Sequence, residues 1–303
     1  MGSRVLITGG TGLVGSRLSA ILAERGYEVV HLSRHKSISS RYKTYSWDID
    51  GDTIEEGAID HTGVVVHLAG AGVADKRWTA ARKKKLASSR IESANLILKQ
   101  LKSSGQKIDT FISASAIGIY GFDTGGILQT EDRIQLGDDF LATLTKKWEE
   151  AADQFSDLEA RVVKLRIGLV LSNEGGLLAK LRPMANMGLS SALGNGDQYM
   201  SWIHIDDLVN MIIFAIENKE ISGVYNAVAP HPVSNREFTR VLSQTLKKPY
   251  FLPNAPKFLL KMAFGELASA ITGGNNVSSH KIMDSGFQFK FQKLDESLQD
   301  LMA

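Results

Sequence analysis

The chain contains no cysteine among its 303 residues. This absence excludes disulfides, thiolate nucleophiles and metal sites built from cysteine. No apolar run reaches the roughly 18 residues that a membrane-spanning helix needs. The N-terminus enters a predicted strand by residue 4, which leaves no room for a signal peptide. We therefore expect a cytoplasmic protein without a membrane partner.

A dominant charge of either sign is also missing, because 35 basic and 33 acidic residues leave a net charge of +2. Such a balance carries little of the electrostatic footprint of a nucleic-acid-binding protein, so we expect no nucleic-acid partner. One stretch, residues 77–90, is basic: it could attract cofactor phosphates or an anionic substrate, or form a solvated helix face. The seven histidines show no metal-ligand spacing with carboxylates, so no metal is predicted.

The most informative stretch is VLITGGTGLVGSRL, which begins at Val5. Its first four residues suit a strand buried on both faces, and a glycine-rich turn then leads into apolar residues at helical spacing. In such a strand–turn–helix unit, glycines permit a tight turn, let backbone amides approach a pyrophosphate and let the helix pack on the strand. The free N–H groups and the positive end of the helix dipole then face the anion. We therefore predict a dinucleotide-binding site.

The second predicted strand, residues 28–32, leads into Ser33 and Arg34. An NAD site usually has a carboxylate here, which accepts a hydrogen bond from the ribose 2′-hydroxyl. Arg34 cannot accept one, but it can pair with a 2′-phosphate, and Ser33 can donate to the same group. We therefore predict NADP(H) as the cofactor; the alternative is an arginine that is merely solvated on a surface loop.

Strand-like and helix-like runs alternate through the first half of the chain. Predicted strands cover residues 64–70, 110–115 and 161–171, and predicted helices cover residues 79–103 and 139–155. This alternation predicts an α/β fold with a Rossmann-type, doubly wound parallel sheet. Ligands of such a sheet bind beyond the carboxyl ends of its strands.

Beyond residue 172 the alternation weakens, and five of the six prolines lie from Pro230 onward. We predict an NADP(H)-binding Rossmann domain over residues 1–172, which regains a strand near residues 224–228. The remainder, residues 173–303, is predicted as a smaller, mainly helical C-terminal domain that binds substrate.

A series of motifs extends along nearly the whole chain: ITGGTGLVG, HLSR, YSWD, HLAGAG, KRW, SSRIESANLI, SASAIGIYG, KKWEEAA, LRIGLVLSNEGG, GNGDQYMSWIHIDD and SGFQF. In this order they resemble the YfcH-like group of epimerase-family proteins. These are atypical extended short-chain dehydrogenases/reductases of the NAD-dependent epimerase/dehydratase superfamily. The resemblance implies an NADP(H)-binding Rossmann domain and a smaller C-terminal domain, but no particular substrate or reaction.

The resemblance also implies which residues contact the cofactor. They form the glycine loop, the ends of two strands and three further positions: Gly9, Thr11, Gly12, Leu13, Val14, Gly15, Ser33, Arg34, Leu68, Ala69, Gly70, Lys85, Arg90 and Val170. Arg77 and Trp78 are expected near the mouth of the site. In the motif WIHIDD, Asp206 is expected to cap the apolar helix that follows, and His204 is expected to have a structural role.

The chemistry of the superfamily relies on a Tyr-x-x-x-Lys pair. The tyrosine is the general acid/base, and the lysine, one helical turn away, lowers its pKa. None of the seven tyrosines here is followed by a lysine four residues later. The predicted helix 139–155, which should carry the pair, contains lysines but no tyrosine. Lys146 could replace the ribose-binding lysine, or it could be a solvated helix residue.

Two residues remain as catalytic candidates. Ser115 ends its predicted strand where the superfamily has a hydrogen-bonding serine, and Ser89 stands where an asparagine is usual. Tyr120 is the only nearby phenol, and the alternative is a packed aromatic side chain. With an ordinary pKa near 10 and no lysine, it would be a poor base but a usable donor.

Two functions fit these observations. The first is an NADP(H)-dependent oxidoreductase or nucleotide-sugar-type epimerase, in which Ser115 polarises the carbonyl of a small-molecule substrate. The second is a catalytically silent NADP(H)-binding sensor or partner-binding protein. The retained Ser115 supports the first, and the absent pair supports the second.

Overall fold

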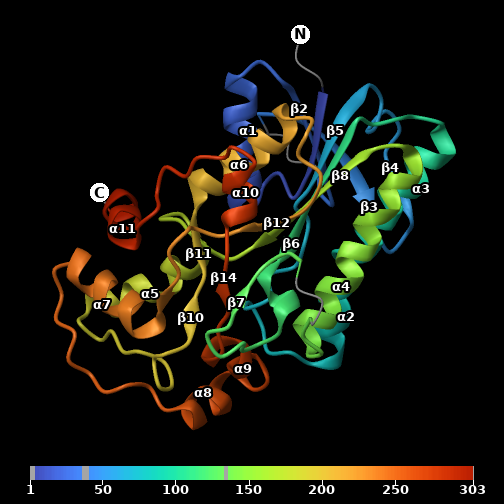
Figure 1. Cartoon of the computed structure of the whole chain (residues 1–303). Coiled ribbons are helices and arrows are strands. Elements are labelled where there is room, and N and C mark those ends of the chain that lie inside the picture. The colour runs from blue at the N-terminus through green and yellow to red at the C-terminus, as the bar shows by residue number, and fades with distance from the viewer. Residues whose placement is uncertain (1–3, 36–40, 133–135, 303) are drawn as a thin grey trace.

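The computed structural model describes residues 4–35, 41–132 and 136–302. An eight-stranded sheet forms its centre, with the strand order β12-β8-β6-β5-β1-β2-β3-β4 (Figure 1). The strands are β1 (Arg4–Thr8), β2 (Glu28–Ser33), β3 (Lys43–Asp48), β4 (Thr53–Ile54), β5 (Thr62–His67), β6 (Thr110–Ala116), β8 (Arg161–Ile167) and β12 (Gly223–Ala227). All neighbours pair in parallel except β3 and β4. The sheet confirms the predicted Rossmann-type fold.

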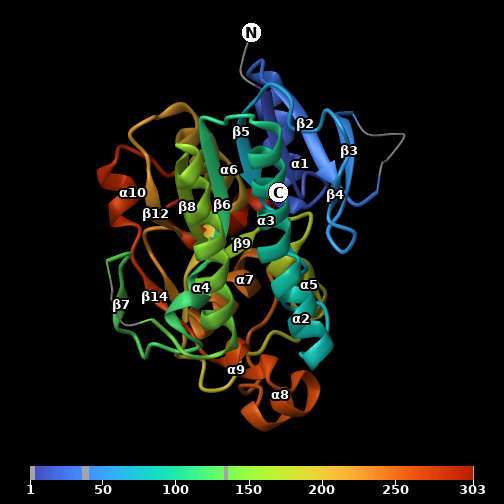
Figure 2. The same ribbon diagram turned by 90° about the vertical axis from the view of Figure 1, so that its right-hand side faces the viewer.

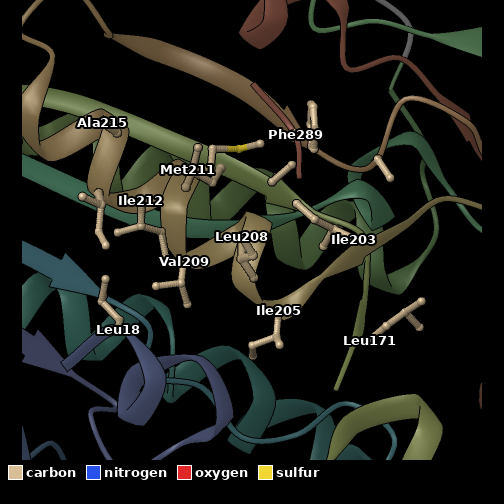
Figure 3. Packing of buried hydrophobic residues seen from close by; sticks show 14 of the residues in the cluster. Leu18, Leu171, Ile203, Ile205, Leu208, Val209, Met211, Ile212, Ala215 and Phe289 are labelled. Carbon is tan, nitrogen blue, oxygen red and sulfur yellow. The ribbon is translucent and has the colours of Figure 1, made fainter. Parts of the chain in front are cut away.

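Helices cover both faces of this sheet. On one face lie α1 (Leu13–Glu24) and α6 (Ile205–Glu217); on the other lie α3 (Ile91–Ser104) and α4 (Phe140–Asp153) (Figures 1 and 2). Side chains of β1 alternate between the two layers, so that Val5 and Ile7 belong to the first core and Leu6 to the second. Figure 3 shows the first core, where Leu18 of α1 lies beside Val209 of α6. This burial on both faces explains the continuous apolar run in β1.

The helix predicted over residues 79–103 is wrong as a single element. The structure has α2 (Ala80–Ser88) and α3, separated at Ser89 and Arg90. Arg90 leaves regular helical geometry with φ −114°. Its guanidinium donates to the carbonyl oxygen of Leu86 at 3.0 Å, and this side-chain contact at the end of α2 accompanies the break.

The strand predicted over residues 161–171 is also two elements, β8 and β9 (Leu169–Leu171), because Gly168 interrupts it. A Cβ at Gly168 would lie 2.3 Å from the carbonyl oxygen of Ser201, so only glycine allows these two segments of the chain to approach each other so closely. Beyond this point β9 leaves the main sheet and pairs with β11 (Trp202–His204). The prediction lacked β3 and β4, which extend the sheet past β2.

The N-cap of α6 lies two residues before the predicted one, Asp206. The helix begins at Ile205, and its N-cap is His204, whose Nδ1 accepts a hydrogen bond from the backbone N–H of Asp206 at 3.1 Å. Asp206 instead pairs with Arg17 of α1 at 3.0 Å. The carboxylate of Asp207 accepts the backbone N–H groups of two residues near the C-terminus. These contacts make the motif structural, as expected for His204.

The rest of the chain is mainly helical and lies largely beyond the carboxyl ends of the strands (Figure 1). Its helices are α5 (Gly176–Asn186), α7 (Asn235–Thr245), α8 (Lys257–Phe264), α9 (Leu267–Thr272), α10 (His280–Asp284) and α11 (Leu294–Met302). Two short strand pairs accompany them: β10 (Tyr199–Met200) with β13 (Val233–Ser234), and β7 (Leu128–Gln129) with β14 (Asn276–Val277). Within this half, β12 returns to the main sheet beside β8.

Candidate functional site

The order of the strands fixes where a ligand can bind. β1 lies between β2 and β5 in the sheet. From β1 the chain continues through α1 to β2 on one side, whereas β5 pairs with the other side of β1. At such a switch point, the loops beyond the carboxyl ends diverge and leave a crevice. The glycine loop follows β1 and Leu68–Ala69–Gly70 follows β5, so both predicted contact segments border the same crevice.

The glycine loop has the close approaches that its sequence predicts. Gly9 has φ +69°, and a Cβ there would lie 2.9 Å from the carbonyl oxygen of Leu68. A Cβ at Gly15 would lie 2.3 Å from the carbonyl oxygen of Gly9, which shows how tightly α1 packs on the turn. At Gly12, by contrast, the same carbonyl oxygen at 3.2 Å is the nearest atom, so the loop is open above this residue. A bulky ligand group therefore has room at Gly12.

The start of α1 is suited to an anion. Gly12 is its N-cap with φ −79° and ψ 173°, and no side chain caps the helix. No acidic residue lies in the first turn. Thr11 and Gly12 are exposed, and Leu13 and Val14 are half-buried. The backbone N–H groups and the helix dipole therefore fit a dinucleotide pyrophosphate at this point.

Thr8 joins the ends of the two central strands, a role that sequence reasoning missed. Its hydroxyl oxygen accepts the backbone N–H groups of Leu68 and Ala69, both at 3.1 Å. It also lies 2.9 Å from Nδ1 of the fully buried His67. Burial lowers the pKa of His67 to about 4, so the ring is neutral at neutral pH. These contacts hold the loop after β5 against the glycine loop.

Ser33 and Arg34 lie at the carboxyl end of β2. Since Thr8 pairs in register with Leu32, these two residues follow β2 next to the point where the glycine loop follows β1. Ser33 is half-buried and Arg34 is exposed. Their position is the one at which a Rossmann fold recognises the adenosine ribose.

Arg90 shapes the loop after β5. Besides Leu86, its guanidinium donates to the carbonyl oxygen of Ala71 at 3.0 Å and lies 5.0 Å from the ring centre of Trp148. Burial lowers the pKa of Arg90 to about 10, so it remains charged at neutral pH. A Cβ at Gly70 would lie 3.0 Å from its Cζ atom, so the loop passes directly over the guanidinium. Ser89 accepts the backbone N–H of Ala71 and fastens the same loop.

The two other predicted cofactor contacts occupy different settings. Lys85 is exposed on α2, whereas Val170 is half-buried in β9. The side chain of Leu13 lies 3.3 Å from the Cβ position of Gly175, just before α5. The glycine loop therefore touches the segment that follows β9, which brings Val170 to the same side of the sheet.

Ser115 and Tyr120 belong to one buried hydrogen-bonded network. The hydroxyl of Ser115 donates to Oε1 of Glu149 at 2.6 Å. Arg166 donates to both oxygens of Glu149, from Nε at 2.8 Å and from Nη2 at 3.0 Å. Its Nη1 donates to the Tyr120 hydroxyl at 3.0 Å, which donates in turn to Oδ1 of Asn226 at 2.8 Å. The network thus joins the carboxyl ends of β6, β8 and β12 to α4.

Electrostatics keep the network in one protonation state. Burial opposes the charge of Arg166, but the Glu149 carboxylate outweighs it and raises the pKa of the guanidinium. Burial raises the pKa of Tyr120, against the opposing effect of Arg166. The phenol is therefore neutral at neutral pH, and it is 4% exposed at the end of the 3₁₀ helix η1 (Ile117–Tyr120). Tyr120 packs within the network, as the second interpretation of its sequence position anticipated.

The face of α4 that leads away from Glu149 lacks an acid–base pair. One turn earlier lies Thr145, which is buried and whose hydroxyl donates to the carbonyl oxygen of Leu141 at 2.7 Å. Two turns earlier lies Leu141 itself, whose Cβ is 3.4 Å from the Cβ position of Gly118 in η1. On this face α4 has leucine and threonine at i, i+4 spacing, and the whole helix contains no tyrosine.

The partnership of Arg166 with Glu149, and that of Tyr120 with Asn226, were not predicted from the sequence. A signal for Glu149 was present, because it lies between Trp148 and Ala152 on the apolar face of a predicted helix. A carboxylate on such a face needs a buried cationic partner. For Asn226 the sequence offers no comparable signal.

The loop between β5 and α2, which contains Arg77 and Trp78, contacts both halves of the chain. Trp78 is buried against Phe140 and Phe122, with ring centres 5.1 and 6.2 Å away. Arg77 donates to the carbonyl oxygen of Met262 in α8 at 3.3 Å. Lys180 of α5 donates to the carbonyl oxygen of Ala74 at 3.0 Å. The loop between β5 and α2 is therefore held from α5 and from α8.

A separate cavity of about 1170 Å³ lies at the opposite, amino-terminal ends of β5, β6 and β8. Charged side chains line it, but several are already paired, as in Arg25 with Glu217 at 2.9 Å and Lys107 with Glu159 at 2.6 Å. It is remote from the glycine loop and from the buried network, so we do not assign the site to it.

Comparisons with known proteins agree with this geometry. The sequence model of the NAD dependent epimerase/dehydratase family matches residues 5–142, and a domain of unknown function, DUF1731, matches residues 255–301. Epimerase family protein YfhF of Bacillus subtilis is 32% identical over 300 residues, which cover 99% of this chain and 98% of that protein.

Two solved structures are also similar. The human epimerase family protein SDR39U1 (isoform 2), crystallised with NADPH, matches with a TM-score of 0.87 and 28% identity over 98% of each chain. A nucleoside-diphosphate sugar epimerase from Corynebacterium glutamicum matches with a TM-score of 0.81 and 31% identity over all of this chain and 58% of that one. The chain therefore belongs to the epimerase-family proteins of the NAD-dependent epimerase/dehydratase superfamily, atypical members of the extended short-chain dehydrogenases/reductases.

Proposed function

We propose that this protein binds NADP(H) and acts as an oxidoreductase or nucleotide-sugar-type epimerase on a small carbonyl or sugar-like substrate. The observation that carries the proposal is the open glycine loop at the switch point of the sheet. Its helix N-terminus has no side-chain cap and no acidic residue in the first turn. That arrangement supplies what a pyrophosphate needs.

The choice of NADP(H) over NAD(H) rests on Ser33 and Arg34. A guanidinium at the end of β2 is complementary to a 2′-phosphate and cannot accept a hydrogen bond from a 2′-hydroxyl. The human relative SDR39U1, with 28% identity, was crystallised with NADPH, which supports the same choice. In this proposal the glycine loop holds the pyrophosphate, and the loop after β5 borders the cofactor.

When bound, the nicotinamide supplies or accepts a hydride. Ser115 would hold the reacting oxygen of the substrate. In the structure its proton is donated to Glu149, so its oxygen offers a lone pair and can accept a hydrogen bond from a substrate hydroxyl. To polarise a carbonyl, the serine hydroxyl must turn away from Glu149. Arg166 keeps Glu149 in place by its two hydrogen bonds and so fixes Ser115.

Proton transfer is the weak part of this site. The Tyr120 hydroxyl is neutral and already bonded to Asn226 and Arg166, and α4 contains no tyrosine. We expect slow turnover of generic aldehydes and ketones, because acid–base assistance is worth about 10²–10⁴-fold. The same observation favours a second candidate, a catalytically silent NADP(H)-binding sensor or partner-binding protein.

Titration tests the cofactor and turnover separates the two candidates. NADPH should bind more tightly than NADH, and Arg34→Asp should weaken NADPH binding about 10- to 150-fold by removing a charge-assisted phosphate contact. Arg240→Asp, on the remote helix α7, is the matched control and should leave binding unchanged. Equal dissociation constants for the two cofactors in the unmodified protein contradict the proposal. Loss of NADPH absorbance with a carbonyl panel would favour the enzyme over the sensor.

A further inference from the structure

Helix α8 and the loop before it expose large apolar side chains. Phe251, Phe258 and Met262 are 73%, 64% and 72% exposed. Leu259 and Phe264 are also among the exposed apolar residues, and none of the eight residues of α8 is buried. Side chains exposed to this degree stand out from the surface and do not line a groove. A helix with this composition needs a partner to cover it.

The two lysines of α8 form a stripe beside the exposed apolar stripe of the same helix. Phe258 and Met262 are four residues apart, as are Lys257 and Lys261, so each pair forms its own stripe. Near its C-terminal end α8 is fastened to the first half of the chain, where Arg77 donates to the carbonyl oxygen of Met262. A peripheral helix with lysines beside an apolar face is typical of segments that lie in a membrane interface.

The charged side chains of α8 and of the segment before it have one sign. Residues 241–265 contain four lysines and no aspartate or glutamate, in a chain whose total net charge is only +2. Two of these lysines, Lys247 and Lys248, precede the exposed Phe251, and the other two lie on α8 itself. A surface that combines local positive charge with protruding aromatic groups is complementary to an anionic interface.

The end of α5 extends the same surface. The Cβ position of Gly188 lies 3.2 Å from Pro249, so the two segments are in contact. Next to it, Met187 is 63% exposed and Leu189 is 42% exposed. Residues 175–196 likewise contain no acidic residue. We define the α8 surface as the exposed apolar residues of α8 and its preceding loop, together with Met187, Leu189 and the lysines of residues 247–261.

We propose that the α8 surface docks this protein on an anionic phospholipid bilayer, with α8 lying in the plane of the interface. None of the helices in the described ranges could cross a membrane, but docking of this kind needs no spanning segment. The sequence-based expectation of no membrane partner rested on the lack of such a segment.

A second copy of the chain is a poorer occupant. A two-fold symmetric contact would bring the Lys257 and Lys261 stripe of each copy close to that of the other, and like charges repel. A folded protein partner would have to supply a groove for several protruding side chains at once. A bilayer accepts them without a preformed groove, and its anionic headgroups meet the lysines.

Vesicle flotation of the full-length protein tests the proposal. The protein should float with vesicles of phosphatidylcholine mixed with phosphatidylglycerol, much less with phosphatidylcholine alone, and less as salt rises. Lys257→Gln with Lys261→Gln should weaken binding about 25-fold, since each lysine near an anionic surface contributes about fivefold. Phe258→Ser with Met262→Ser should weaken it at least about 10-fold.

The control is Lys107→Gln with Lys219→Gln, which removes the same charge from the cavity at the opposite ends of the strands and should change binding less than about twofold. Thermal unfolding of each variant should match the parent, because all four α8 positions are exposed. Failure of the parent to bind the mixed vesicles overturns the proposal and leaves an acidic protein as the partner class. If light scattering shows a dimer, and if Phe258→Ser with Met262→Ser dissociates that dimer, the proposal is overturned in favour of a contact between two copies of the chain.

Discussion

Replacing Glu149 by glutamine should destabilise the protein more than any exposed ion-pair change. The carboxylate accepts from Ser115 and twice from Arg166, and the side chains of Glu149 and Arg166 are only 9% and 6% exposed. The ammonium of Lys164, also buried, lies 4.0 Å away. Glutamine keeps the shape but leaves Arg166 without its anion and places an amide donor against a guanidinium donor, whereas Lys164 keeps its ion pair with Asp153 at 2.6 Å. Breaking one partner of a buried pair costs about 3–5 kcal/mol.

For a chain of this size, that loss corresponds to a fall of roughly 5–8 °C in Tm, measured by circular dichroism. Glu237→Gln is the matched control, because Glu237 and Arg240 make the same kind of pair with side chains 42% and 45% exposed. It should cost less than about 1 kcal/mol. Glu149→Leu combined with Arg166→Met removes both charges and should be more stable than Glu149→Gln alone. Equal, small effects of Glu149→Gln and Glu237→Gln would refute the buried pair.

Three other outcomes test the remaining parts of the site. Gly12→Val should abolish NADPH binding while the protein stays folded, because φ −79° suits valine and its Cβ would meet only the carbonyl oxygen of Gly9, at 3.2 Å, which must shift by a few tenths of an ångström; normal binding in isothermal titration would place the phosphate elsewhere. The folded-state pKa of His67, about 4, is below its ordinary 6.5, so the folded chain binds fewer protons there. The neutral His67 ring therefore contributes about 3 kcal/mol to the stability of the folded state above pH 6.5, and this contribution is lost as the pH falls toward 4. His67→Gln should flatten the pH dependence of Tm. Ser115→Ala should lower kcat on a true substrate about 10²-fold with little change in cofactor affinity, whereas Tyr120→Phe should act mainly on Tm; full activity of Ser115→Ala contradicts the assignment.

The sequence predicted the fold because its signals are local and agree with one another. A buried strand, a glycine turn and an amphipathic helix follow one another at the N-terminus, and each has the geometry expected for a βαβ unit. The errors arose where a long-range contact decided the local structure. Arg90 ends α2 by reaching carbonyl groups on two segments, and Gly168 bends the chain because Ser201 passes beside it.

The candidate site was predicted less completely for the same reason. Ser115 could be found from its strand end, but its partner Glu149 lies 34 residues later and its role depends on how α4 packs. Tyr120 is fixed by Asn226, which is 106 residues away along the chain. Periodicity and turn chemistry carry no information about pairs so far apart, so neither contact could be derived from the sequence alone.

The position of β12 has a consequence for synthesis of the protein. β12 (Gly223–Ala227) forms the edge of the sheet and pairs with β8. It is synthesised only after more than two-thirds of the chain, long after β8. Until then β8 has an open edge, and an unpaired strand edge is a template for association with other chains. The nascent protein must therefore keep a nearly finished sheet from aggregating while some 50 further residues are added, and a fragment that stops before β12 should be insoluble rather than a smaller version of the fold.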